Sequence, residues 1–273
     1  MSTSLQTNFD EVRAAYAPVF DALERALQQF DIDFYLIGAQ ARDVWLNHLG
    51  IITRLTKDID YCVLVGDRET WEGLNKYLAE TEKFERDKNV PHRFYLGEHT
   101  IDIIPFGNIQ NEDEVQLDNP LLDISVFGCR EVADDAADVD GRFKVVTLPG
   151  LCVLKVVAYS EKSERVKDWD DFLLIANNYS DIAGEQLFDG NYDDLLDGDF
   201  DMKLAATRML GRHMSTILNK NEELRKTVLD LLSSRLARFT SQDIEQMYVV
   251  RERDDKQVET LKLVFEIIKG IND

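Results

Sequence analysis

The apolar pattern of the chain changes at Pro149-Gly150, and this change constrains the fold more than any other feature. Before it, short apolar runs typical of strands alternate with segments whose apolar residues recur at three- and four-residue steps. After it, the helical spacing continues alone. The first part therefore predicts a mixed β-sheet with helices packed on it, and the second predicts a helical region. The predicted fold class is α+β, with domains at residues 1–148 and 149–273.

The first part is predicted to alternate between helices and strands. One helix is expected over residues 8–30, where apolar side chains share one face. Two strands are expected to form a hairpin across Gly97-Glu98-His99. Acidic, turn-rich connections are expected at 108–119 and 131–142. The other helices are predicted at 39–49 and 69–80, and the strands at 34–37, 58–65, 94–96, 100–104, 122–127 and 143–147.

The second part is predicted to contain helices and their connections. The acidic stretch from Ser180 to Asp201 is either a domain linker or a long surface loop. Gly211-Arg212-His213 is expected to interrupt a helix, and Gly270 is expected to end the last one. The helices are predicted at 150–161, about 167–178, 203–219, 222–236, 241–249 and 254–269.

The net charge of −21 is the unusual bulk property of this 273-residue chain. A field of that sign repels polyanions unless a local basic patch opposes it, so general nucleic-acid binding is disfavoured. A small phosphorylated ligand held with a divalent metal is compatible with it. The sequence has no apolar run long enough to span a membrane and no signal-peptide pattern, which predicts a cytoplasmic protein. Cys62, Cys129 and Cys152 lie in apolar stretches and are expected to be reduced core residues.

Two aspartates stand at the start of the predicted strand 58–65. Residues i and i+2 of a strand point to the same face, so the carboxylates of Asp58 and Asp60 are expected side by side. Adjacent carboxylates repel unless a cation neutralises them, and hard oxygen ligands of this kind suit Mg²⁺. The alternative is a solvated pair at a strand end.

Asp102 is a lone acid inside the apolar run Ile101 to Phe106. An ionised carboxylate is costly to bury there without a partner. Beside Asp58 and Asp60 it would complete the carboxylate set of a two-metal phosphoryl-transfer site, binding one metal and accepting a proton from the attacking hydroxyl. The alternative is a strand acid that points to solvent.

Gly38-Ala39-Gln40 closes the first predicted strand and opens a helix. Such a turn exposes backbone N–H groups and the positive end of a helix dipole, where phosphate binds. Arg42 lies one turn into the helix and could reach a phosphate, whereas a lone glycine is also common in ordinary tight turns. Asp43 and Trp45 are expected to be packing or salt-bridge residues.

This set of residues resembles the motif of the DNA polymerase β-type nucleotidyltransferase superfamily: a glycine turn, then Asp58-Ile59-Asp60 on a strand, then Asp102 on a later one. The resemblance implies that residues 1–148 form the mixed-sheet catalytic core of that superfamily. Three longer stretches are similar to the abortive-infection AbiEii/AbiGii-like family: Ile37 to Asp43, Arg54 to Asp60, and Ile101 to Gly107. The resemblance implies Mg²⁺ or Mn²⁺ held by Asp58, Asp60 and Asp102, with an NTP as substrate. Because Ala39 stands where the family has serine or glycine, backbone N–H groups at Gly38 and Ala39, Arg42 or Arg54 would bind the phosphate instead.

The segment from Leu148 to Asp171 also resembles a helix pair of that family, which implies that Lys155 faces the nucleotide phosphates. From the residues alone, a lysine rooted in an apolar helix face either snorkels to water or reaches into a cleft. Asp168 and Asp171 share a helix face and could orient Lys155 or Arg165, contact the acceptor, or form a solvated face. With Lys155, Asp168 is predicted to be a nucleotide-binding residue. His92-Arg93 is either the edge of the cleft or a surface turn.

Three functions follow from these residues. The leading one is a nucleotidyltransferase that moves an NMP group from an NTP to an acceptor hydroxyl. By resemblance, the acceptor would be tRNA and the enzyme a toxin of a toxin–antitoxin or phage-defence system, with a cognate antitoxin as partner. The second is an enzyme that modifies an antibiotic, another small molecule or a protein, and the third is a non-catalytic nucleotide- or partner-binding module. A basic strip could serve a tRNA acceptor: Lys155, Lys162, Arg165, Lys167, Arg208 and Arg212.

Overall fold

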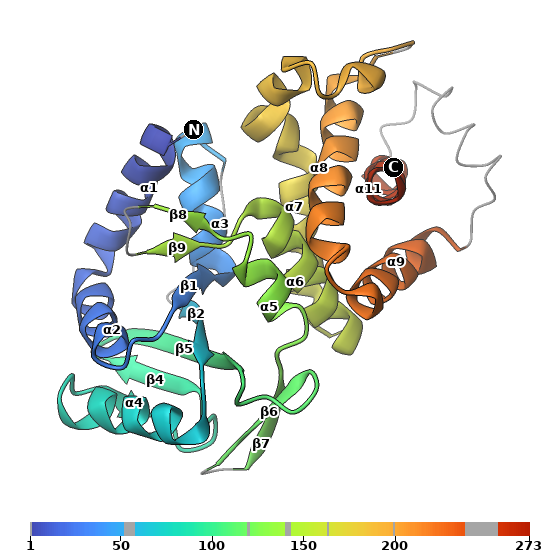
Figure 1. Ribbon diagram of the computed structural model, residues 1–273. Helices are drawn as coiled ribbons and strands as arrows, with labels where there is room; N and C mark the ends of the chain where they lie inside the picture. The colour runs from blue at the N-terminus through green and yellow to red at the C-terminus, as the bar shows by residue number, and fades with distance from the viewer. Residues whose placement is uncertain are drawn as a thin grey trace. The chain divides into compact units, whose positions relative to one another are not determined.

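The computed structural model describes residues 2–51, 58–118, 121–139, 143–162, 164–198, 200–237 and 256–273 (Figure 1). The chain divides into two compact units, Met1–Thr147 and Leu148–Asp273. The first unit contains a mixed β-sheet with flanking helices, and the second is helical, so the predicted fold class is confirmed. No helix among the described residues combines the length and the hydropathy that crossing a membrane requires.

The sheet of the first unit is mixed. Within the described residues its strand order is β3-β4-β5-β2-β1-β9-β8. β2 runs parallel to β5 and antiparallel to β1, and β4 pairs with β5 as the predicted hairpin. The predicted strands 34–37 and 58–65 are confirmed residue for residue. The strand bounds are β1 Phe34–Ile37, β2 Asp58–Val65, β3 Glu85–Arg86, β4 Arg93–Leu96, β5 His99–Gly107, β8 Ala137–Asp138 and β9 Lys144–Val145.

The helices of the first unit differ from the prediction near the N-terminus. The single helix expected over 8–30 is wrong, because the chain breaks at Tyr16 into α1 (Ser2–Ala15) and α2 (Ala17–Gln29). Pro18 stands in the first turn of α2, where its missing N–H costs nothing, but its ring would clash with a preceding carbonyl in one continuous helix. The remaining elements are α3 (Gly38–Leu46), η1 (Asn47–Leu49), α4 (Arg68–Glu80) and α5 (Cys129–Ala133).

The two acidic segments predicted as connections contain regular structure. β6 (Glu114–Leu117) pairs with β7 (Leu122–Ser125) in a small antiparallel sheet. Val115 and Leu117 are buried while Glu114 and Gln116 are exposed, an alternation that the acidic composition obscured. The segment 131–142 likewise includes the end of α5 and β8.

The two faces of the main sheet are covered differently. On one face, the rings of Phe20 from α2 and of Phe34 from β1 both pack against Tyr61 of β2. Figure 1 draws α1 and α2 in blue. On the other, the Tyr35 hydroxyl donates to the Cys129 carbonyl at 2.7 Å, and Cys62 Sγ lies 3.6 Å from Cys129 Sγ. All three cysteines are buried and free, as predicted. Because side chains alternate along β2, Asp58 and Asp60 point to the face of Cys62.

The second unit consists of helices and two short 3-10 turns. Its elements are α6 (Leu148–Glu161), α7 (Val166–Ala183), η2 (Gly184–Phe188), η3 (Asp193–Leu195), α8 (Met202–Leu218), α9 (Glu222–Leu236) and α11 (Lys256–Asn272). The segment 180–201 lies inside this unit, so the linker alternative is wrong. The helix predicted at 241–249 lies outside the described residues.

Two glycines were predicted to break helices and do not. α8 continues through Gly211, and α11 continues past Gly270 to Asn272. A Cβ on Gly211 would lie 2.3 Å from the Ile267 carbonyl oxygen, and one on Gly270 would lie 2.0 Å from the Arg208 carbonyl oxygen. Both glycines therefore serve the close approach of the α8 and α11 backbones.

Candidate active site

The three predicted aspartates lie together on two neighbouring strands. Asp60 of β2 is in register with Asp102 of β5, and residues paired laterally in a sheet point to the same face. Asp58, two residues earlier on β2, shares that face and lies opposite Thr100. We call Asp58, Asp60 and Asp102 the aspartate cluster. The strand pattern explains why the three lie close together. Asp58 and Asp60 are two residues apart on one strand, and Asp102 is the direct neighbour of Asp60 on the next strand.

Asp102 is bonded to an arginine that the sequence did not single out as a site residue. The Arg93 guanidinium donates from Nε to Asp102 Oδ1 and from Nη2 to Asp102 Oδ2, each at 2.7 Å. The Asp102 side chain is 12% exposed, so it does not point to solvent, whereas the Arg93 side chain is 34% exposed. Arg93 thus lies opposite Asp102 on β4 and His92 in the turn before it, and a position at the edge of a cleft stays a prediction.

The electrostatics of this pair extend to its neighbours. The hydrogen bonds that Arg93 donates to Asp102 raise the pKa of Arg93 against the effect of burial, and the negative charge of Asp58 adds to the shift. Burial lowers the pKa of the adjacent His92, and the charge of Asp102 opposes that shift. Arg93 is therefore a permanent cation beside the cluster, whereas His92 favours its neutral form.

A signal for Arg93 is present in the sequence. β4 and β5 pair from Leu96 with His99, which leaves a two-residue turn and places Arg93 opposite Asp102. The expected turn across Gly97-Glu98-His99 is one residue longer than this. In a hairpin the length of the turn fixes the register, so the extra residue hides the partner of Asp102.

Gly38 brings the start of α3 against the cluster. It has φ +69°, and a Cβ built on it would lie 2.0 Å from Asp60 Oδ2. The absence of a side chain thus allows the Asp60 carboxylate to lie on the Gly38 backbone. The predicted strand-to-helix turn is confirmed, with Ala39 half-buried in the first turn of α3. A helix N-terminus beside the carboxylates offers backbone N–H groups to an anion.

Arg42 does not reach the surface. Its side chain is fully buried, and its guanidinium contacts Asp43 Oδ1 through Nη2 at 2.8 Å and through Nε at 2.9 Å. Asp43 and Trp45 have the structural roles expected of them, since the Trp45 indole donates to the Val146 carbonyl at 2.8 Å. The phosphate contact of Arg42 stays a prediction, and Arg54 lies outside the described residues.

Lys155 and Asp168 belong to the helical unit, where they bond to one another. Lys155 Nζ donates to Asp168 Oδ1 at 2.7 Å and lies 3.0 Å from Asp171 Oδ2. Arg165 Nε lies 2.7 Å from the other oxygen of Asp168. Three roles were considered for Asp168 and Asp171, and these contacts support the first, the orientation of Lys155 and Arg165. Asp168 contacts both cations, and Asp171 contacts Lys155. Contact of Lys155 or Asp168 with a nucleotide stays a prediction.

The basic strip proposed for tRNA is largely paired with acids. Lys155 and Arg165 contact Asp168, Arg208 contacts Asp273, and Arg212 contacts Asp194. His213 accepts or donates at both ring nitrogens, at 2.7 Å from the Tyr179 and Tyr192 hydroxyls. These contacts give Arg212 and His213 structural roles within the helical unit.

The carboxylates of the aspartate cluster are the ligand type that a hard divalent cation prefers, but the three are not arranged around one point. Among the described residues, no three His, Cys, Asp or Glu side chains are gathered closely enough to hold a metal ion. Both oxygens of Asp102 face Arg93, which supplies its positive charge here. Carboxylate oxygens such as those of Asp58, Asp60 and Asp102 are the ligand type that suits Mg²⁺ or Mn²⁺.

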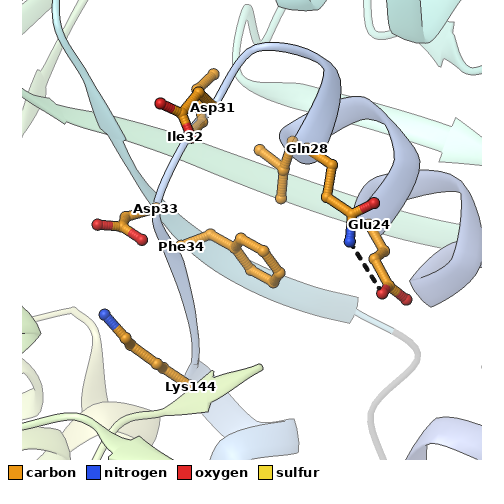
Figure 2. A pocket seen from close by; sticks show the side chains of 8 residues that line it. Glu24, Gln28, Asp31, Ile32, Asp33, Phe34 and Lys144 are labelled. Carbon is orange, nitrogen blue, oxygen red and sulfur yellow. Dashed lines mark hydrogen bonds between the residues drawn. The ribbon is translucent and has the colours of Figure 1, made fainter. Parts of the chain in front are cut away.

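A pocket elsewhere in the first unit is separate from the cluster. It lies where α2 ends and β1 begins, and Figure 2 shows Asp33 and Lys144 on one side of it and Glu24 with Gln28 on the other. Phe34 points to the face of Tyr61, opposite that of Asp60. The lining residues are Glu24, Leu27, Gln28, Asp31, Ile32, Asp33, Phe34 and Lys144.

Comparisons with known proteins give distant structural similarities. No protein-family model and no curated protein matches the chain. The solution structure of the antibiotic-resistance factor ANT(2'')-Ia is 14% identical, with a TM-score of 0.35 over 71% of this chain and 96% of that one. The crystal structure of an antigenic nucleotidyltransferase-like protein from Paracoccidioides brasiliensis is also 14% identical, with a TM-score of 0.38 over 80% of this chain and 92% of that one.

Proposed function

We propose that this chain is a metal-dependent nucleotidyltransferase that moves an NMP group from an NTP to an acceptor hydroxyl. The observation that carries the proposal is the aspartate cluster, in which Asp60 and Asp102 are in register and Asp58 shares their face. The start of α3 at Gly38 lies against Asp60, so an anion-binding helix end adjoins the carboxylates. This combination of groups suits phosphoryl transfer, because catalysis there consists mainly of positioning and charge stabilisation.

Each residue of the cluster has a role in this proposal. Asp58 and Asp60 would hold Mg²⁺ or Mn²⁺, which when bound neutralises the charge of the substrate phosphates. Asp102 orients the acceptor hydroxyl and accepts its proton. The N–H groups at Gly38 and Ala39 bind a phosphate oxygen of the NTP, and the missing side chain at Gly38 keeps that approach open.

For the acceptor, we favour a small molecule or a protein over tRNA. Four of the six basic residues in the strip contact carboxylates, and the whole chain carries a net charge of −21. A polyanionic acceptor would have to displace those contacts and approach against the field. The tRNA acceptor, the toxin role and the antitoxin partner rest on the family resemblance alone.

Labelled nucleotide tests the proposal. Purified chain is incubated with Mn²⁺ or Mg²⁺ and each NTP labelled at the α-phosphate, together with cationic small molecules, cell lysate or total tRNA. We expect label transfer with release of pyrophosphate, and a loss of about 10³-fold in Asp60→Asn, because the variant keeps the shape but removes a ligand charge. Glu72→Gln is the control, since Glu72 is exposed on α4 of the same unit.

The same assay separates the enzyme from the binding module. Asp60→Asn should melt at the same temperature as the unaltered chain, so that its loss reports on the site. If the unaltered chain binds NTP but transfers label to no acceptor and releases no pyrophosphate, the non-catalytic module is correct and the enzyme is not.

A further inference from the structure

Arg93 and Asp102 form the pair from which a further role can be drawn, and this inference rests on the proposed function. Arg93 is fixed opposite Asp102 by the β4–β5 register, and both of its hydrogen bonds to that carboxylate are 2.7 Å long. Two parallel N–H···O bonds from one guanidinium are the strongest arrangement available to such a pair. Both oxygens of Asp102 thus accept a hydrogen bond from Arg93.

This engagement competes with the role proposed for Asp102. A carboxylate oxygen that accepts a bond from Arg93 has less capacity to bind a cation or to take a proton from the acceptor. A divalent cation next to Asp102 would also repel the guanidinium, since both are positive. Binding of a metal ion alone is therefore opposed by Arg93.

Substrate phosphate removes the conflict. The planar fork of an arginine matches phosphate oxygens as well as it matches a carboxylate. Arg93 is about three times as exposed as Asp102, at 34% against 12%, so the arginine is the partner that can turn outward.

We infer that Arg93 is the phosphate-binding residue of this site: it occupies Asp102 in the free protein and exchanges it for the substrate's phosphates. Metal and nucleotide then bind cooperatively, because the nucleotide withdraws the guanidinium that opposes the metal. Reciprocity requires that metal raise nucleotide affinity by the same factor. Arg93 acts on binding, so its effect is measurable without turnover.

The inference is tested by measuring Mn²⁺ binding with electron paramagnetic resonance, first for Mn²⁺ alone and then with a non-hydrolysable NTP analogue. In the unaltered chain the analogue should tighten Mn²⁺ binding by about 10-fold or more. In Arg93→Gln, Mn²⁺ alone should bind about 5- to 10-fold more tightly than to the unaltered chain, and the tightening by the analogue should fall below about 2-fold. Arg68→Gln is the matched control, because it removes an arginine whose ion pair with Asp118 is exposed.

The outcomes distinguish this inference from the proposed function. If Mn²⁺ binds the unaltered chain but Arg93→Gln behaves as Arg68→Gln does, Arg93 has no such role and the nucleotidyltransferase proposal stands. If Mn²⁺ binds none of the proteins, with or without the analogue, the metal site itself is wrong. Should Arg93→Gln fail to fold, Arg93→Lys keeps the charge and loses the fork, and it must weaken the coupling between metal and nucleotide.

Discussion

Each unit contains a largely buried group in which carboxylates contact a cation, and the two groups differ in how the cation is held. In the helical unit, Lys155 lies between Asp168 and Asp171 and is 14% exposed. In the sheet unit, Arg93 reaches Asp102 from the neighbouring strand and is 34% exposed. The Lys155 ammonium is enclosed by two carboxylates on the facing helix, whereas one side of the Arg93 side chain is exposed to solvent.

This difference separates a structural pair from an exchangeable one. Lys155 joins α6 to α7 through two carboxylates, so it contributes to stability as long as all three charges stay together. Arg93 adds two hydrogen bonds to an acid that is itself a candidate ligand. A solvent-exposed cationic side chain can exchange its carboxylate partner for a ligand, and an enclosed one cannot.

The largest expected effect is the loss of Lys155. Lys155→Met leaves Asp168 and Asp171 as buried carboxylates without this ammonium, and we expect the free energy of unfolding to fall by about 3–5 kcal/mol. Urea unfolding followed by circular dichroism measures it. Arg165→Gln is the control, because the Arg165 side chain is 53% exposed and should cost about 1 kcal/mol or less.

A second variant decides whether Lys155 also binds nucleotide. In the triple variant Lys155→Met, Asp168→Asn, Asp171→Asn, most of the lost stability should return, because no charge is left buried. If stability returns while NTP affinity is lost, nucleotide binding involves this group of three residues, to which the predicted phosphate ligand Lys155 belongs. Unchanged NTP affinity would leave it the structural role alone.

The next effect concerns the glycine against the cluster. In Gly38→Ala the new methyl would overlap Asp60 Oδ2, at 2.0 Å, and the backbone would stay at φ +69°. We expect transfer activity to fall about 100-fold, equivalent to about 2.7 kcal/mol, with a stability loss of about 1–2 kcal/mol. Gly97→Ala is a matched control: its φ is +63°, but the added Cβ meets no described atom within 4 Å.

Activity and melting temperature together check this prediction. Gly97→Ala should lose comparable stability and keep its activity, because the conformational strain is the same and the contact with Asp60 is missing. If both variants lose activity alike, the strain at positive φ explains the result and the proximity of Gly38 to Asp60 does not.

Much of the candidate site could be predicted because its signals are local. Asp58 and Asp60 lie on one strand, and the Gly38 turn directly follows another, so alternation and a single glycine suffice. A position of Asp102 beside Asp58 and Asp60 was expected from a lone acid in an apolar strand, and the register with Asp60 comes from the structure. The bond from Arg93 was not, because it depends on a hairpin register that one residue of turn length changes.

The sequence predicted the elements in which the spacing of apolar residues is uninterrupted. It did not predict features that depend on contacts between distant segments. β2 and α9 match their predicted bounds. Gly211 and Gly270 looked like helix breaks, because a sequence read one segment at a time does not show that the two helices touch. Arg42 likewise appears available for phosphate in the sequence, and only the tertiary structure shows it buried against Asp43.

A smaller effect on stability is expected for Arg93 than for Lys155. Arg93→Gln removes two hydrogen bonds from Asp102, and we expect a loss of about 1–2 kcal/mol, because water can reach the side that the arginine leaves open. Adding Mn²⁺ with a non-hydrolysable NTP should restore stability, since ligands that bind the native state stabilise it. Urea unfolding with and without both ligands is the measurement. A loss as large as that of Lys155→Met would mean that the two cations are equally fixed.

The smallest effect sets the baseline for this comparison. Arg68 pairs with Asp118 at 2.8 Å, and their side chains are 43% and 56% exposed. Arg68→Gln should therefore cost about 0.5 kcal/mol or less, and the difference should shrink in high salt, where exposed charges are screened. Arg93→Gln should keep most of its cost in salt, because Asp102 is largely buried. If the two variants lose equal stability and respond equally to salt, burial of Asp102 contributes nothing, and the Arg93 pair is an ordinary surface contact.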